Sequence, residues 1–475
     1  MLFTDPLFLF YFLPVSLLAL RTCGTGKGFT PIARWTIILS TLVFYAYENW
    51  LWCILFLTVV GGIYVCTIPV LIAQTRLARR AGLVVAVIFA LFSLGLFKYL
   101  NWLVTLFPGL QPVQNALASY FGSEGLIILP PGISFYVFEA LSFTIDAYRG
   151  RIERKIRWLD YLSFLAMFPR FVAGPIVRYS DMAAQFTAWT APRYSQGLSV
   201  FALGFTIKNL FADQFAIFVP YAFGSHQPDM AQAWLGSLSY AFQLYFDFWS
   251  YSLMASGLGL CLGFEFPDNF KSPYRATSVS DFWQRWHITL SQWLRDYLYI
   301  SLGGNRCAPW RVYLNLLLTM TIAGLWHGAS FTFVMWGAYH GILLVGERLV
   351  GEARLSRLPL RSRQLITFLL VLLGWVVFRS ESFTQVASVL RGMVGLHGIA
   401  PQFSLLLVEK HLPSLLLILA ACYFWVRIEP RIVAQSPIST CIFPKHVQYT
   451  LLGSFAAALI LCLSSQEIPF LYFQF

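Results

Sequence analysis

The feature that most constrains this chain is the recurrence of long apolar stretches along its whole length. About 20 apolar residues suffice to cross the hydrocarbon core of a bilayer as an α-helix. Continuous runs of this kind predict an all-α polytopic membrane protein, whereas a β-barrel would show short alternating segments. The runs lie at about 7–20, 36–48, 51–74, 82–101, 125–148, 158–177, 196–222, 234–263, 312–328, 331–346, 365–379, 413–426 and 449–464.

The composition excludes an ordinary soluble protein. Of the 475 residues, 58% are hydrophobic and only 11% are charged, whereas soluble domains carry roughly 25% charged residues. The net charge of +12 is explained by basic loops beside a membrane, so membrane lipid is the expected partner and no nucleic acid is. With no repeat and no soluble segment, the sequence predicts a single integral-membrane domain over 1–475.

The basic residues predict the orientation of the spans. The run at 158–177 is interrupted by Arg170 between Pro169 and Pro175 and is read as a re-entrant segment, which leaves twelve spans. With the N-terminus outside, inner loops then hold all but six of the 33 Lys and Arg residues, as the positive-inside rule requires. Both termini are therefore expected on the outer side. The six exceptions are Lys98, Arg170, Lys208, Arg379, Arg391 and Lys410.

One inner loop holds an unusual aromatic and basic stretch, "FWQRWHITLSQWLRDYLYISLGGNR" at 282–306. We expect a helix with Ser280 as its N-cap and two faces. One reading is an interfacial helix anchored by tryptophans at the headgroups. The other is a helix that lines a cytoplasm-facing cavity for a charged substrate. The predicted faces are Phe282, Trp286, Thr289 and Trp293, and Gln284, His287, Ser291 and Arg295.

Two histidines lie at membrane depth, where ionisable groups are costly and usually functional. His327 ends one apolar run and His340 lies in the next. A histidine suits a base that deprotonates a hydroxyl, because its unperturbed pKa of about 6.5 lies near working pH. Small residues four apart predict close helix packing around both histidines. They are the pairs Gly324 with Gly328 and Gly337 with Gly341.

Other polar residues interrupt apolar runs and favour ion pairs inside the bundle, although catalysis is an alternative for each of them. The cysteines and remaining histidines show no spacing typical of a zinc site, so no metal is expected. The polar residues are Glu139, Asp146, Lys208, Asp213 and Asp247.

Several motifs together resemble the membrane-bound O-acyltransferase family and its bacterial exopolysaccharide O-acetyltransferase branch. The stretch at 282–306 is followed by "GLWHGAS" and "WGAYHG", and the chain also carries "PGISFYVFEALSFTIDAYRG", "FPRFVAGPIVRYSDM" and a terminal "PFLYFQF". The resemblance implies a curved helical bundle of about 12 spans with a re-entrant segment, in which an inner and an outer funnel meet near a histidine.

The resemblance also implies the site residues. His327 matches the family's catalytic histidine and His287 its second functional position. The 287 helix is expected to tilt into the membrane and line a tunnel that ends at His327. The expected donor-tunnel residues are Trp283, Arg285, Trp286, Ser291, Arg295, Asp247 and Arg306.

The implied function is transfer of an acetyl group from a cytoplasmic donor, expected to be acetyl-CoA, with no bound cofactor. The group would cross the bacterial inner membrane for O-acetylation of an exported alginate- or cellulose-type polysaccharide. A periplasmic SGNH-type acetyltransferase would be the partner, and both termini would be periplasmic. Peptidoglycan O-acetylation, D-alanyl transfer to teichoic acid, and a non-catalytic transporter are the alternatives.

One segment departs from the family pattern. Relatives typically read "DFSGYSDMA" where this chain has "DFWSYSLMA" at 247–255. Trp249, Ser250 and Leu253 therefore replace a serine, a glycine and an aspartate. The lost carboxylate cautions against assuming that alginate itself is the acceptor.

Overall fold

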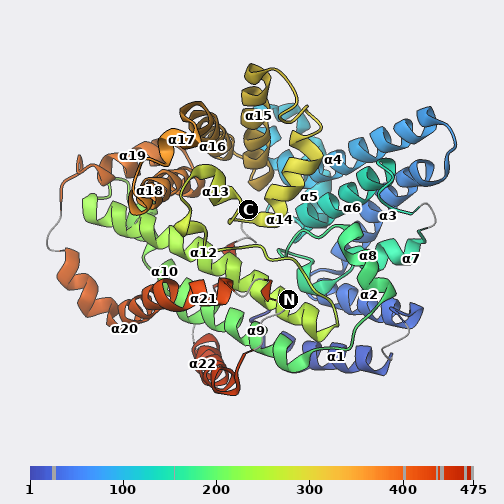
Figure 1. Cartoon of the computed structure of the whole chain (residues 1–475), viewed down its shortest axis with the longest axis horizontal. Helices are drawn as coiled ribbons and strands as arrows, with labels where there is room; N and C mark the ends of the chain where they lie inside the picture. The colour runs from blue at the N-terminus through green and yellow to red at the C-terminus, as the bar shows by residue number, and fades with distance from the viewer. Residues whose placement is uncertain are drawn as a thin grey trace. The chain divides into compact units, whose positions relative to one another are not determined.

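The computed structural model describes residues 1–23, 28–153, 156–399, 403–434, 437–438, 443–464 and 468–471. Within these residues the chain is mostly helical (Figure 1). The strands found in them are the two of a short hairpin, β1 (Gly122–Ser123) and β2 (Leu126–Ile127). The expected all-α class is thereby confirmed. The last four residues of the terminal "PFLYFQF" lie outside the described part of the chain.

The described residues group into two compact units. Unit 1 comprises Met1–Leu198 and Ala255–Phe266, and unit 2 comprises Ser199–Met254 and Pro267–Phe475. The prediction of a single domain over 1–475 stays a prediction. The helices that lie wholly in unit 1 are α1 (Leu13–Thr22), α2 (Pro31–Ala46), α3 (Trp50–Ile72), α4 (Arg76–Leu106), α5 (Gln111–Phe121), α6 (Ile133–Tyr148), α7 (Trp158–Leu165) and α8 (Tyr179–Thr187).

Two further helices, α9 (Tyr194–Thr206) and α12 (Met230–Cys261), contribute residues to both units. The remaining helices belong to unit 2. They are α10 (Asp213–Ala216), α11 (Val219–Phe223), α13 (Val279–Trp283), α14 (Ile288–Trp293), α15 (Pro309–His327), α16 (Phe331–Val350), α17 (Glu352–Leu355), α18 (Leu360–Arg379), α19 (Phe383–Met393), α20 (Phe403–Tyr423), α21 (Glu429–Val433) and α22 (Lys445–Ser464), with π-helical segments η4 (Ile207–Ala212), η6 (Leu294–Tyr299) and η7 (Phe424–Ile428).

Five helices in the described part of the chain are long and apolar enough to cross a membrane. Three shorter apolar helices, Phe8–Thr22, Pro31–Ala46 and His411–Arg427, accompany them. The chain is thus a multi-pass membrane protein, and the count of about 12 spans stays a prediction. The five helices are Trp50–Ile72, Arg76–Leu106, Tyr194–Phe223, Leu360–Arg379 and Lys445–Ser464.

The interrupted run at 158–177 is organised around a buried ion pair in unit 1. The Arg170 guanidinium pairs with the Glu139 carboxylate on α6 and also donates to the carbonyl oxygen of Phe164. The same carboxylate accepts from the backbone N–H of Val177 at 3.1 Å. Because both charges are satisfied by these contacts, we assign Glu139 and Arg170 a structural role. A re-entrant path for this segment stays a prediction.

In unit 2, α15 and α16 lie side by side (Figure 1) at very close range. A Cβ atom on Gly324 would lie 2.2 Å from the carbonyl oxygen of Phe333, and one on Gly337 would lie 2.2 Å from that of Met320. Only glycine permits such an approach of two backbones. The predicted small-residue packing around His327 is therefore confirmed.

The aromatic stretch is not the continuous helix expected from its periodicity. Its first helix is α13, and the N-cap is Ser278 rather than Ser280: the Ser278 hydroxyl accepts from the Asp281 N–H at 3.0 Å. The helix stops because residues upstream take its backbone hydrogen bonds. Lys271 N–H donates to the Arg285 carbonyl at 2.9 Å, and Ile288 N–H donates to the Asn269 carbonyl at 3.0 Å.

Candidate active site

His327 is the last residue of α15 and is only 7% exposed. Its imidazole stands perpendicular to the Trp336 ring, at 5.2 Å between ring centroids, and lies 5.4 Å from the Phe378 ring. The tight packing of α15 on α16 therefore holds this histidine against a fixed aromatic wall. The imidazole also lines a cavity.

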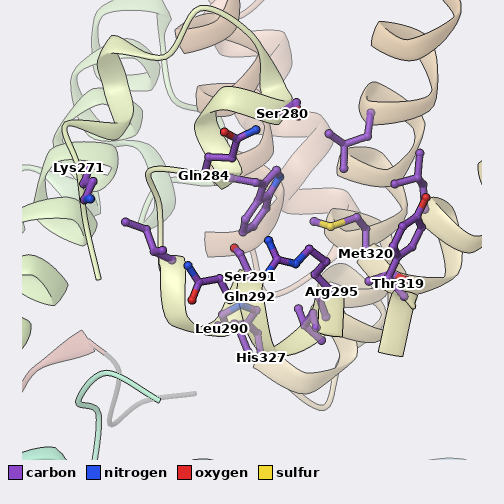
Figure 2. A pocket seen from close by; sticks show the side chains of 17 residues that line it. Lys271, Ser280, Gln284, Leu290, Ser291, Gln292, Arg295, Thr319, Met320 and His327 are labelled. Atoms are coloured by element: carbon purple, nitrogen blue, oxygen red, sulfur yellow. The ribbon is translucent and has the colours of Figure 1, made fainter. Parts of the chain in front are cut away.

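That cavity has a volume of about 670 Å³ and lies within unit 2. Figure 2 shows labelled side chains from the 280–295 segment and from α15 around a common space. Of the expected site residues, Trp283, Ser291, Arg295 and His327 line it. Its polar lining comprises Lys271, Ser280, Gln284, Ser291, Gln292, Arg295, Tyr299, Thr319 and His327.

Apolar side chains form much of the remaining wall, among them Leu290, Leu294, Leu316, Met320, Ala323 and Leu344. Two cations complete the lining. Arg295 forms two hydrogen bonds with Asp296, at 2.7 and 3.3 Å. Lys271 has no ion pair recorded among the described residues and lies apart from Arg295 in Figure 2. The cavity can therefore hold an elongated molecule with an apolar body, amide groups and an anionic part.

His287 lies outside the described lining of this cavity and is fully buried. Its backbone adopts the left-handed conformation, with φ 42° and ψ 54°, at the break between α13 and α14. The Trp326 indole lies beside both histidines, at 6.3 Å from the His287 ring and 4.9 Å from the His327 ring. Burial lowers the pKa of His287 to about 3, so this imidazole is neutral at neutral pH.

Two more of the expected tunnel residues, Trp286 and Arg285, lie outside the described lining of the cavity. Trp286 is 3% exposed and packs on Trp375 at 4.9 Å and on Phe270 at 5.1 Å between ring centroids. Arg285 pairs with Asp281 at 2.6 Å. A direct role in a tunnel stays a prediction for both residues.

Asp247 belongs to a separate buried cluster in unit 2. Its carboxylate lies 2.8 Å from the Lys208 ammonium and accepts from the Leu471 N–H at 2.9 Å. Lys208 also pairs with Asp213 at 2.7 Å. The favoured prediction of an ion pair inside the bundle fits these contacts. Arg306 is exposed in the loop that precedes α15.

The three residues that depart from the family pattern, Trp249, Ser250 and Leu253, are buried on the same helix as Asp247. Trp249 is stacked on Tyr245, with 5.5 Å between ring centroids and an interplanar angle of 1°. The Ser250 hydroxyl donates to the Asp247 carbonyl at 2.6 Å, and Leu253 is 4% exposed. Each replacement is thus accommodated by packing or a local hydrogen bond.

Three residues of the site region were missed by reasoning from the sequence. Asn269 contacts His287, Lys271 lines the cavity, and Glu347 accepts from the backbone N–H groups of Val279 and Ser280 at the start of α13. Asn269 and Lys271 lie in the irregular segment before α13, where no periodicity marks them. For Glu347 the available signal was a carboxylate near the end of an apolar run.

A family model describing the membrane-bound O-acyltransferases, MBOAT, matches residues 81–383, which include every residue of the cavity. The chain belongs to this family. It is therefore a multi-pass membrane O-acyltransferase, and the cavity that His327 lines lies within the matched part of the chain.

Bacterial O-acyltransferases are among the relatives of this MBOAT protein. It is 42% identical over 399 residues to a probable alginate O-acetylase, AlgI, of Pseudomonas aeruginosa, covering 82% of this chain and 73% of that protein. It is 38% identical over 506 residues to the probable alginate O-acetylase of Pseudomonas putida, covering both chains in full. A peptidoglycan O-acetyltransferase of Helicobacter pylori is 36% identical over 433 residues, or 84% of this chain and 81% of that protein.

Proposed function

We propose that this membrane O-acyltransferase moves an acetyl group from a cytoplasmic thioester donor, acetyl-CoA, toward an exported polysaccharide of the alginate or cellulose type. The observation that carries the proposal is a buried histidine, His327, at a large cavity with amide, hydroxyl and cationic side chains. The similarity to alginate O-acetylases over the full length of the chain supports the acetyl group and the polysaccharide.

The cavity lining suits such a donor. A thioester donor of this class has a narrow arm with amide groups and a phosphorylated end. Gln284, Ser291 and Gln292 can exchange hydrogen bonds with amides, and Lys271 and Arg295 supply positive charge for phosphate. The apolar wall excludes water, which strengthens each of these interactions.

In the transfer step, His327 would act as the general base. An imidazole nitrogen takes the proton from the acceptor hydroxyl as its oxygen attacks the thioester carbonyl. The carbon–sulfur bond breaks, the sulfur leaves as a thiolate, and the imidazolium returns the proton to it. The ester formed carries the acetyl group onward, and the donor is released as a free thiol.

The expected setting is the bacterial inner membrane, with both termini in the periplasm. A periplasmic SGNH-type acetyltransferase would complete delivery to the sugar. The charge asymmetry of the loops supports this orientation, in which Lys271 and Arg295 of the cavity would lie on the cytoplasmic side.

His327→Ala tests the function directly. We expect polymer O-acetylation to fall to background at matched membrane expression, because the imidazole that acts as the proposed base is removed. The readout is ester-linked acetate released by mild alkali from the purified polymer. Full acetylation in this variant would contradict the assignment of His327 as the base.

Peptidoglycan is the second candidate acceptor, because the Helicobacter pylori relative is a peptidoglycan O-acetyltransferase of similar coverage. The two acceptors separate when ester-linked acetate is measured in parallel on purified exopolysaccharide and on purified sacculi. Loss of acetate from the sacculi alone in the His327→Ala strain would favour peptidoglycan.

A further inference from the structure

A buried asparagine lies directly against His287. Asn269 is 2% exposed, in the segment between α12 and α13. Its side-chain oxygen, Oδ1, lies 3.1 Å from His287 Nδ1, 2.9 Å from the Thr289 hydroxyl and 3.4 Å from the Thr289 backbone nitrogen. Its amide nitrogen, Nδ2, lies 3.3 Å from the Ser252 hydroxyl.

These partners fix which way the amide points. A backbone N–H can only donate a hydrogen bond, so the amide atom that faces the Thr289 backbone nitrogen must be the oxygen rather than the NH₂ group. The Ser252 hydroxyl can accept, which suits the Nδ2 end. The orientation of Asn269 therefore follows from the surrounding chemistry.

The orientation of the amide in turn fixes the proton on His287. An amide oxygen has no hydrogen to donate, so His287 Nδ1 must be the donor and must carry the proton. Because His287 is neutral at neutral pH, its other nitrogen, Nε2, then holds a lone pair. Phe248 on α12 and Trp326 on α15 lie against the His287 ring, at 4.7 and 6.3 Å between ring centroids.

Asn269 also holds the backbone of the histidine. Its carbonyl oxygen accepts from the Ile288 N–H at 3.0 Å, directly after the left-handed His287. This conformation is uncommon for a residue with a side chain. Asn269 therefore restrains both the main chain and the ring of His287, and hydrogen-bond partners of this kind orient functional imidazoles.

We propose that Asn269 is a positioning residue that holds His287 in the Nδ1–H tautomer, so that Nε2 acts as a hydrogen-bond acceptor during acyl transfer. The proposal rests on the role of His287 in the proposed acyltransferase function. An imidazole with its lone pair at Nε2 can accept a hydrogen bond from an N–H or O–H group, whereas the opposite tautomer presents a donor there.

Asn269→Leu and Asn269→Asp form the test, with Ser252→Ala as the matched control. The leucine removes the acceptor at similar size, whereas the aspartate keeps an acceptor for Nδ1–H. We expect acyl transfer to fall about 10- to 100-fold in Asn269→Leu, the range for partners that orient a functional imidazole. Ser252→Ala removes only the Nδ2 partner and should transfer at the wild-type rate.

The pH profile separates positioning from packing. In Asn269→Asp, a carboxylate replaces a neutral oxygen beside Nδ1 and raises the pKa of His287. The acid limb of the rate profile should therefore move to higher pH while substantial activity returns relative to Asn269→Leu. Equal loss in both variants, with an unchanged profile in protein of normal thermal stability, would overturn the proposal.

A spectroscopic readout keeps the inference independent of the proposed function. Imidazole ¹⁵N chemical shifts distinguish the two neutral tautomers, and the His287 signal is the one that disappears in His287→Ala. We expect the Nδ1–H tautomer in the wild type and in Ser252→Ala, and its loss in Asn269→Leu. The Nε2–H tautomer in the wild type would refute the inference, whatever the transfer activity.

Discussion

At the scale of single residues, the two histidines differ in what surrounds them. His327 lines the large cavity, whereas His287 is enclosed beside Phe248 and Asn269. Trp326 lies next to both rings. A base must reach its proton directly, which favours His327, while an enclosed neutral imidazole is suited to orienting a bound group.

This difference predicts a split between the two alanine variants. His287→Ala should weaken binding of the donor, and His327→Ala should abolish transfer while donor binding stays nearly unchanged. Binding can be measured with a non-hydrolysable acetyl-CoA analogue on purified protein, next to the transfer rate. Equal loss of binding in both variants would show that the two roles are not separate.

Lys208 is a second instructive residue, because its ammonium is buried between two carboxylates. In Lys208→Ala, the buried carboxylate of Asp247 and the partly exposed carboxylate of Asp213 would lose this cation. Breaking such a pair costs about 3–5 kcal/mol, so the unfolding temperature in detergent should drop strongly. Glu352→Ala removes an exposed carboxylate that pairs with Arg363 and should change stability by about 0–1 kcal/mol. A similar small effect in both variants would contradict the structural role of the cluster.

At the scale of elements, the pair α15 and α16 positions the site. Glycine contacts bring the two helices together, His327 ends α15, and Trp336 on α16 faces its ring. On the same α16, a Cβ atom on Gly346 would meet nothing within 4 Å. Two glycines of one helix thus differ only in whether another backbone lies against them.

Gly337→Ala and Gly346→Ala exploit that difference. The first methyl group would lie 2.2 Å from a backbone oxygen, so the helices must separate, at a cost of about 1–3 kcal/mol for overpacking. Gly346→Ala should be neutral or stabilise the helix by up to about 1 kcal/mol. The unfolding temperature and the rate of acyl transfer should both fall in Gly337→Ala and stay near the wild-type values in Gly346→Ala. Comparable behaviour of the two variants would argue against the close packing.

At the scale of the whole molecule, the uneven distribution of basic residues predicts the orientation in the membrane. Inner loops hold nearly all Lys and Arg residues, including Arg354, Arg357 and Arg361 between two predicted spans. The loop after Arg379 holds few. Translocation of a basic loop is disfavoured, so the side of each loop follows from the sequence.

Reporter fusions test this orientation. Alkaline phosphatase, which is active only in the periplasm, should be active when fused after Leu396 and inactive when fused after Arg357. A fluorescent reporter that matures only in the cytoplasm should give the opposite pattern at the same two positions. Activity of the phosphatase at both positions, or at Arg357 alone, would contradict the predicted topology.

The sequence alone determined the features that depend on local composition. The length of the apolar runs predicts helices in a membrane, the basic loops predict their orientation, and glycines four apart predict the close packing of α15 on α16. His327 was identifiable because an ionisable residue at the end of an apolar run is rare. Each of these signals lies within one contiguous segment of the chain.

Only the tertiary structure decided the features that join distant segments. Periodicity predicted one helix through 282–295, but Asn269 and Lys271 take its backbone hydrogen bonds and break it at His287. The lining of the cavity and the contact of Asn269 with His287 also bring together segments that lie apart in the sequence. Hydrogen bonds between distant segments can outweigh the local helix propensity, and neither segment's own sequence pattern reveals them.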